Sequence, residues 1–203
     1  MVLLSSTSGI SQSSLLLRIM KRWLRIVLFI IALLVAYCAI RKAYVLRNTY
    51  TPSADQVDAL GMLGKEAIRS GDVPVAALLL YSDSIIGRGC NTVLRDGNAG
   101  GHAEVNALSD AFRSLGRDRF DRLDRERMVL LTTFEPCAMC KGLILEYRIG
   151  HVAFIEPRSV WHWIKEDLRS ITYELTRQRS GPESLQDSLF RLHPAYDPAR
   201  SDH

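Results

Sequence analysis

The sequence predicts an α/β domain that follows one long apolar helix near the N-terminus. Apolar runs of strand length alternate with segments in which apolar residues recur at helical spacing. Two of the runs are separated by a short turn, which is typical of an antiparallel hairpin. A later pair of runs is separated by a helix-length segment, which favours parallel pairing. We therefore expect a mixed sheet.

The first helix of this domain is expected between Ser53 and Gly71. Ser53 and Gln56 form a capping-box pattern, in which each side chain can bond the backbone N–H of the other residue. Apolar residues follow at helical spacing, and a glycine such as Gly71 is a common end point of a helix. The apolar positions are Val57, Leu60, Met62, Leu63 and Ile68.

Five later segments have strand-like patterns, namely residues 75–81, 85–91, 128–133, 152–155 and 171–175. The first two flank the turn at residues 82–84, so they are expected to form the hairpin. The fifth rests on the alternation of Ile171, Tyr173 and Leu175.

Helices are expected between these strands at residues 102–115, 137–147 and 161–168. The Gly- and Asn-rich segment 96–101 predicts a flexible loop that leads into the first of them. A last helix is predicted from the apolar residues Leu185, Leu189, Phe190 and Leu192.

Two short motifs supply the ligands of a metal site. One is His102-Ala103-Glu104 and the other is Pro136-Cys137-Ala138-Met139-Cys140. One imidazole and two thiolates fill three corners of a tetrahedral Zn²⁺ and leave the fourth for water, whereas a structural zinc site is closed by a fourth protein ligand. Zinc lowers the pKa of bound water from about 16 towards 7. His102, Cys137 and Cys140 are therefore candidate zinc ligands, and Glu104 is the candidate catalytic proton carrier.

Each motif has a simpler interpretation when it is taken alone. A C-x-x-C pair can be a redox disulfide or half of a zinc ribbon, but the chain has no second C-x-x-C. His102 could be a polar residue at a helix start, and Glu104 could be an acid that complements the helix dipole. The combination of the two motifs favours the catalytic interpretation.

The pattern H-x-E with P-C-x-x-C is the signature of zinc-dependent nucleobase deaminases. At these residues the sequence resembles the cytidine and deoxycytidylate deaminase superfamily, particularly the branch with tRNA adenosine, guanine, cytosine and nucleoside deaminases. Residues 72–77, 89–91 and 102–108 agree with the family pattern, and the resemblance extends from Ser53 to Arg158.

The resemblance implies a three-layer α/β/α fold with a mixed five-stranded sheet, and Zn²⁺ held between two helix starts. It implies hydrolytic deamination of a nucleobase, nucleoside or nucleotide, with Asn91 and Ala103 as substrate-binding residues. Asn91 could instead simply end a strand. A tRNA adenosine deaminase and a non-catalytic zinc-binding membrane scaffold remain the alternatives, and a homodimer remains open. The intact Glu104 argues against the scaffold.

Residues 26–40 form an uninterrupted apolar run with cationic residues on both sides. As a helix the run spans only about 22 Å, whereas the hydrocarbon layer is about 30 Å thick. Flanking residues extend it, so we expect a single-pass transmembrane anchor at residues 23–46. A cleaved signal peptide is the main rival, although Tyr37 is bulky for a cleavage site.

The expected organisation has four parts. Residues 1–22 form an N-terminal segment in which Met20 is an alternative translation start, and residues 23–46 form the anchor. The deaminase domain covers residues 50–192 and a loose tail covers residues 193–203. The charges that flank the anchor nearly balance, so they do not decide its orientation. Reduced cysteine ligands suit a cytoplasmic catalytic domain.

The formal net charge of +4 comes from the N-terminal region. Residues 1–50 contain seven Lys and Arg and no acid, so the rest of the chain carries 19 bases against 22 acids, a net charge of −3. Phosphate neutralisation dominates the affinity of proteins for nucleic acid. We therefore expect a small-molecule substrate and do not expect nucleic acid as a partner.

Overall fold

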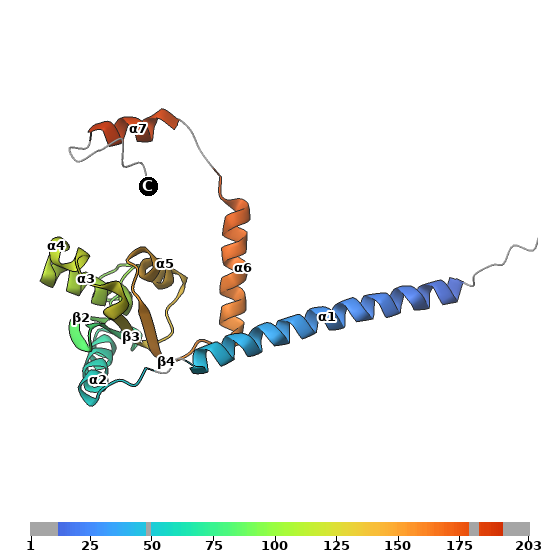
Figure 1. Cartoon of the computed structure of the whole chain (residues 1–203), viewed down its shortest axis with the longest axis horizontal. Coiled ribbons are helices and arrows are strands. Elements are labelled where there is room, and N and C mark those ends of the chain that lie inside the picture. The colour runs from blue at the N-terminus through green and yellow to red at the C-terminus, as the bar shows by residue number, and fades with distance from the viewer. Residues whose placement is uncertain (1–11, 48–49, 179–182, 193–203) are drawn as a thin grey trace, which may run out of the picture. The chain divides into compact units, whose positions relative to one another are not determined.

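The computed structural model describes residues 12–47, 50–178 and 183–192, and divides at Arg158 into two compact units (Figure 1). The expected tail at residues 193–203 and the first eleven residues of the expected N-terminal segment lie outside the described residues.

The first unit contains a mixed sheet of four strands, ordered β2-β1-β3-β4. These are β1 (Ala76–Tyr81), β2 (Ser84–Cys90), β3 (Met128–Phe134) and β4 (His151–Glu156). Strand β1 pairs antiparallel with both β2 and β3, whereas β3 and β4 are parallel. Both the predicted hairpin and the predicted parallel pair are confirmed. Ser82 and Asp83 turn the hairpin with φ values of 48° and 66°, as a two-residue hairpin turn requires.

The predicted fifth strand is wrong. Its residues lie in α6 (Val160–Thr176), the first helix of the second unit, so the helix predicted at residues 161–168 continues to Thr176. An alternation of three residues is too short to distinguish a strand from a helix. The spacing of Ile164, Leu168, Ile171 and Leu175 is four, three and four, which is the spacing of an apolar helical stripe. The second described helix of this unit is α7 (Glu183–Leu192).

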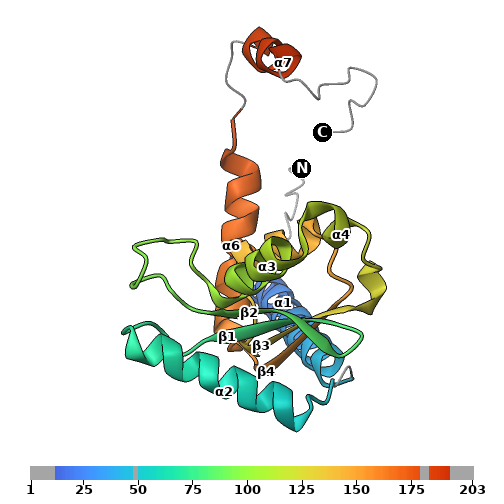
Figure 2. The ribbon, with the colours of Figure 1, turned by 90° about the vertical axis from the view of Figure 1, so that its left-hand side faces the viewer.

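Helices cover both faces of the sheet in the first unit (Figure 2). Helix α2 (Ala54–Arg69) packs its buried Leu60 with Leu78 and Leu131 on one face. Helices α3 (Ala103–Leu115) and α5 (Ala138–Glu146) pack with residues such as Leu79 on the other face. This arrangement gives the expected α/β/α layers. The short helices α4 (Arg117–Asp121) and η1 (Arg125–Arg127) connect α3 to β3.

The start of α2 is fixed by the predicted capping box. Gln56 N–H donates to Ser53 Oγ at 3.3 Å, and Ser53 N–H donates to Gln56 Oε1 at 3.0 Å. The Gln56 side chain is buried and also donates to the carbonyl of Asp83, so the helix start is tied to the hairpin turn.

Two glycines on β2 let α3 lie close against the sheet. A Cβ atom at Gly87 would overlap the carbonyl of Ala107, and one at Gly89 would overlap the carbonyl of Ala103. Only glycine permits this approach of helix backbone to strand backbone. The contact at Gly89 fixes the first turn of α3.

Helix α1 (Gln12–Arg47) precedes the domain. Its segment Leu15–Ala43 is long and apolar enough to cross a membrane, and none of its most apolar window is buried in the structure. Length and composition are compatible with an anchor, and a signal sequence passes the same test.

Candidate metal centre and active-site cavity

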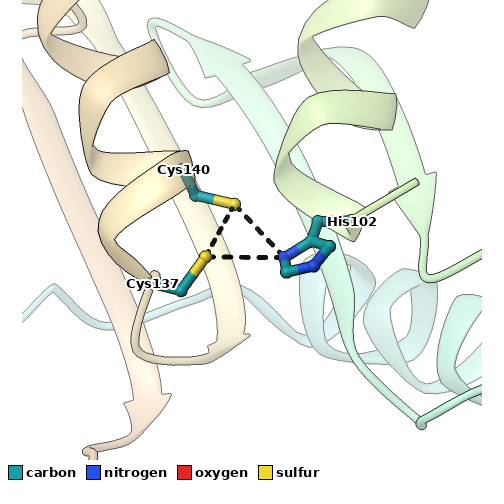
Figure 3. Close-up of side chains that lie close together, drawn as sticks. All are labelled: His102, Cys137 and Cys140. Atoms are coloured by element: carbon teal, nitrogen blue, oxygen red, sulfur yellow. Dashed lines mark hydrogen bonds between the residues drawn. The ribbon is translucent and has the colours of Figure 1, made fainter. Parts of the chain in front are cut away.

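Two helix starts bring the three predicted ligands together (Figure 3). His102 is the residue immediately before α3, Cys137 is the residue immediately before α5, and Cys140 lies in the first turn of α5. The close-up shows His102 Nδ1 facing the two sulfur atoms. His102 is 35 and 38 positions away from the two cysteines in sequence. The three residues meet because both helices pack on one face of the sheet.

The distances between the ligand atoms match a tetrahedral zinc ion. His102 Nδ1 lies 3.6 Å from each sulfur, and the two sulfurs are 3.7 Å apart. Zn–S and Zn–N bonds of usual length at tetrahedral angles give about 3.8 Å between two sulfurs and about 3.6 Å between sulfur and nitrogen. The residues present therefore fit zinc without rearrangement.

The two thiols differ in how easily they ionise. A hydrogen bond from Cys140 is the main reason why the pKa of Cys137 falls to about 5, and backbone N–H groups at the start of α5 contribute. The second ionisation is opposed, because the hydrogen bond that Cys140 donates to the Cys137 thiolate, burial and nearby Glu104 all raise the pKa of Cys140. A divalent cation between the sulfurs favours thiolate at both positions.

Glu104 is buried beside this group, with 4% of its surface exposed. It occupies the second position of α3, and burial is the main reason why its pKa is raised. Its carboxylate lies outside the three-residue group that can hold the ion. A buried carboxyl with a raised pKa next to a metal site is suited to accept and return a proton.

A cavity of about 430 Å³ opens at this centre, lined by both His102 and Glu104. The start of β1 and the ends of β2, β3 and β4 meet at one edge of the sheet. Residues next to these strand ends supply the remaining walls, including Val75, Asn91 and Phe134. The volume lies within the range of about 300–1,000 Å³ that is usual for small-molecule sites.

The two predicted substrate-binding residues are placed differently. Asn91 lines the cavity, and its side-chain oxygen accepts a hydrogen bond from Val93 N–H at 3.1 Å. Ala103 is fully buried in the core between α3 and the sheet, and it is not among the residues that line the cavity. Any contact of Ala103 with a substrate would therefore have to come from its backbone.

Three polar residues at the cavity were not predicted from the sequence, namely Asp72, Glu135 and Arg158. Asp72 accepts hydrogen bonds from the N–H groups of Leu94 and Arg95, at 2.6 and 3.2 Å, so it fixes the loop that leads to His102. Glu135 and Arg158 follow the carboxyl ends of the parallel strands β3 and β4. Ligands commonly bind at that end of α/β sheets, so the position of these two residues after predicted strands could have indicated them as site residues from the sequence.

Comparison with known proteins agrees with this site. Residues 57–156 match the family described as the cytidine and deoxycytidylate deaminase zinc-binding region. The chain is 35% identical over 88 residues to a tRNA-specific adenosine deaminase of Buchnera aphidicola subsp. Schizaphis graminum, covering 43% of this chain and 55% of that protein. It is 38% identical over 90 residues to tRNA-specific adenosine deaminase 2 of Danio rerio, covering 44% of this chain and 42% of that protein.

A solved structure supports the fold. The guanine deaminase from Bacillus subtilis matches with a TM-score of 0.51 and 24% sequence identity, covering 67% of this chain and 91% of that chain. The chain spans only about half of the length of the curated relatives named above. The match in residues 57–156, together with a His/Cys/Cys group that fits zinc, places this chain in the cytidine and deoxycytidylate deaminase superfamily.

Proposed function

We propose that this protein is a membrane-anchored enzyme that hydrolytically deaminates a nucleobase, nucleoside or nucleotide. The observation that carries the proposal is the zinc-compatible group His102, Cys137 and Cys140, because its His102 lines one cavity together with the buried Glu104. The reaction replaces an exocyclic amine of the base with a carbonyl oxygen from water and releases ammonia.

The roles of the residues follow from their chemistry. His102, Cys137 and Cys140 would hold Zn²⁺, which supplies a Lewis acid and a water of lowered pKa when it is bound. Glu104 takes a proton from water and delivers it to a ring nitrogen of the substrate. The same carboxyl then carries a proton to the departing amine. Asn91 lies on the cavity wall, where it can hydrogen-bond the sugar or the ring edge.

A tRNA adenosine deaminase is the second candidate, because the curated relatives described above carry that name. The net charge of −3 on residues 51–203 counts against a polynucleotide substrate. A non-catalytic zinc scaffold is a third candidate, and the buried Glu104 counts against it because a scaffold does not need a proton carrier.

The proposal is tested with the full chain purified in a mild detergent. Zinc content and ammonia release are measured with cytosine, guanine, adenine, and their nucleosides and nucleotides. We expect one zinc per chain and release from at least one compound. Glu104→Gln should keep the zinc and lower the rate by about 10²–10⁴-fold, because the proton carrier is lost.

Other results would decide between the candidates. Ammonia release only from a tRNA substrate would support the second candidate. Stoichiometric zinc without release from any substrate would support the scaffold. A Glu104→Gln variant with normal activity and normal zinc would overturn the role given to Glu104.

A further inference from the structure

One cationic side chain reaches the cavity that contains His102 and Glu104. Arg158 follows β4 and is the only Lys or Arg among the described residues that line the cavity. It was not part of either metal motif, and its side chain is partly exposed.

The guanidinium group of Arg158 is held in a fixed position by its neighbours. Its Nε–H donates to the backbone carbonyl of Glu135 at 2.9 Å, and its backbone N–H donates to Glu135 Oε2 at 2.8 Å. The centre of the guanidinium lies 5.2 Å from the centroid of the Phe134 ring, which is within the range of a cation–π contact. The carbonyl of Glu135 and the ring of Phe134, both at the end of β3, therefore orient the guanidinium, and the backbone contact fixes the start of the side chain.

This arrangement leaves the edge of the guanidinium that carries Nη1 and Nη2 for a ligand. Within the described part of the chain, no hydrogen bond or ion pair joins Nη1 or Nη2 of Arg158 to another residue. The carboxylate of Asp72, which lines the same cavity, is bonded to the loop backbone and to Ser70. The cavity therefore contains a positioned, positively charged pair of donors without a protein acceptor.

We propose that Arg158 binds the phosphate group of the substrate, so that the enzyme prefers a nucleotide to the corresponding nucleoside or free base. This inference rests on the deaminase function proposed above and narrows its substrate class. A planar guanidinium forms two parallel charge-assisted hydrogen bonds with a phosphate, and a fixed Arg loses little freedom when it does so. The base would lie at Glu104 and the metal centre.

The negative charge of residues 51–203 favours a free nucleotide over RNA as the source of this phosphate. A polynucleotide needs many cations along its backbone, whereas a mononucleotide needs only one or two. The net charge of −3 with a single Arg at the cavity agrees with the smaller ligand.

The experiment compares nucleotides with nucleosides in the full chain, loaded with zinc in detergent. Binding of AMP, CMP and GMP and of adenosine, cytidine and guanosine is measured by calorimetry, and kcat/KM is measured wherever ammonia is released. We expect the preferred nucleotide to exceed its nucleoside by roughly tenfold to hundredfold, as a hydrogen-bonded charge pair does.

Arg158→Gln should reduce this ratio towards one through the loss of nucleotide binding, while one zinc per chain is kept. Arg158→Lys, which keeps the charge but loses the two-pronged geometry, should give an intermediate ratio. Arg95→Gln is the matched control. Arg95 pairs with Glu66 and Asp96 and does not line the cavity, so its loss should leave the ratio unchanged.

The outcomes separate this inference from the proposed function. Equal binding and equal kcat/KM for nucleotide and nucleoside in the wild-type protein would overturn the role of Arg158 and leave the deaminase function standing. Nucleotide binding that depends on Arg158 without any ammonia release would support the phosphate contact and count against the proposed function.

A short single-stranded RNA is tested as a second kind of substrate in the same assays. Arg158-dependent turnover of RNA, without binding of mononucleotides, would overturn the preference for a free nucleotide and would identify RNA as the source of the phosphate. If Arg158→Gln loses zinc, the phosphate contact is tested instead by a competition experiment with the wild-type protein. Inorganic phosphate should then displace a bound nucleotide but not a bound nucleoside, and failure to do so would overturn the proposal.

Discussion

Cys137 and Cys140 show how a local feature of a residue fixes its chemistry. Both lie at the start of α5, where the hydrogen bond from Cys140 and then the backbone N–H groups lower the pKa of Cys137. We expect Cys137→Ser to bring bound zinc well below one ion per chain, because a neutral hydroxyl is a much poorer zinc ligand than a thiolate. Cys38→Ser, in α1, should keep full zinc. Elemental analysis of the purified proteins checks both, and full zinc in Cys137→Ser would contradict the ligand set.

Asp72 gives a prediction about pH. Burial by itself raises the pKa of this carboxyl, but hydrogen bonds from Leu94 N–H, the Ser70 hydroxyl and Arg95 N–H together lower it below its ordinary value. The stabilisation is therefore fully present above the ordinary pKa of about 3.9 and is lost as the pH falls through the lower pKa of the folded state.

Asp72→Asn should consequently lower the midpoint of thermal unfolding at pH 7. The difference from wild type should shrink as the pH is lowered below about 4 and should be smallest below the lowered pKa of the folded state, where the wild-type carboxyl is neutral as well. Asp58→Asn, an exposed position on α2, should show no difference at either pH. A gap between wild type and Asp72→Asn that is equally large at both pH values would contradict this account.

At the scale of elements, the contact between β2 and α3 sets the position of the metal centre. A side chain at Gly89 would overlap the carbonyl of Ala103 and the backbone nitrogen of Ala107. Gly89→Ala should therefore push the first turn of α3 away from the sheet and reduce the free energy of unfolding by about 1–3 kcal/mol. Since His102 and Glu104 lie in this turn, the affinity for zinc should fall as well.

Gly61→Ala is the matched control for this change. Gly61 lies inside α2, and a Cβ atom there would meet nothing within 4 Å. Alanine in a helix interior is favoured over glycine by about 0.5–1 kcal/mol, so this variant should be slightly more stable than wild type. Urea unfolding and zinc titration measure both effects. Equal stability of the two variants would show that the contact at Gly89 can relax.

At the scale of the whole molecule, we propose that residues 23–46 within α1 anchor the catalytic domain to a membrane on its cytoplasmic side. The full chain should then resist extraction from membranes by alkaline carbonate, whereas a chain that lacks residues 1–47 should be extracted. A Leu33→Arg change at mid-helix should weaken insertion by about 2.5–3.5 kcal/mol, because a cation at the bilayer centre is costly. Intact mass measures cleavage, and a mature chain that begins after residue 36 would show that α1 is a signal peptide.

Features that depend on local spacing could be predicted from the order of residues. Cys137 and Cys140 are three residues apart at one helix start, and His102 lies two residues before Glu104 at another. The capping box needs Ser53 and Gln56 at fixed spacing, and the hairpin needs a short turn. Each is set by bonds between near neighbours, so it is visible in the order of residues. Where the local pattern was too short, as at residues 171–175, the prediction failed and the longer helical stripe decided the structure.

The residues that line the cavity beside the metal centre could be identified only from the packing of the folded chain. Asp72, Asn91, Phe134 and Arg158 come from the neighbourhood of four different strand ends, and they meet because of the strand order and register. Ala103, next to a ligand in sequence, faces the core instead because α3 packs tightly against Gly89. Strand pairing brings together residues that are far apart in sequence, and the local periodicity of apolar residues does not predict which of them will meet.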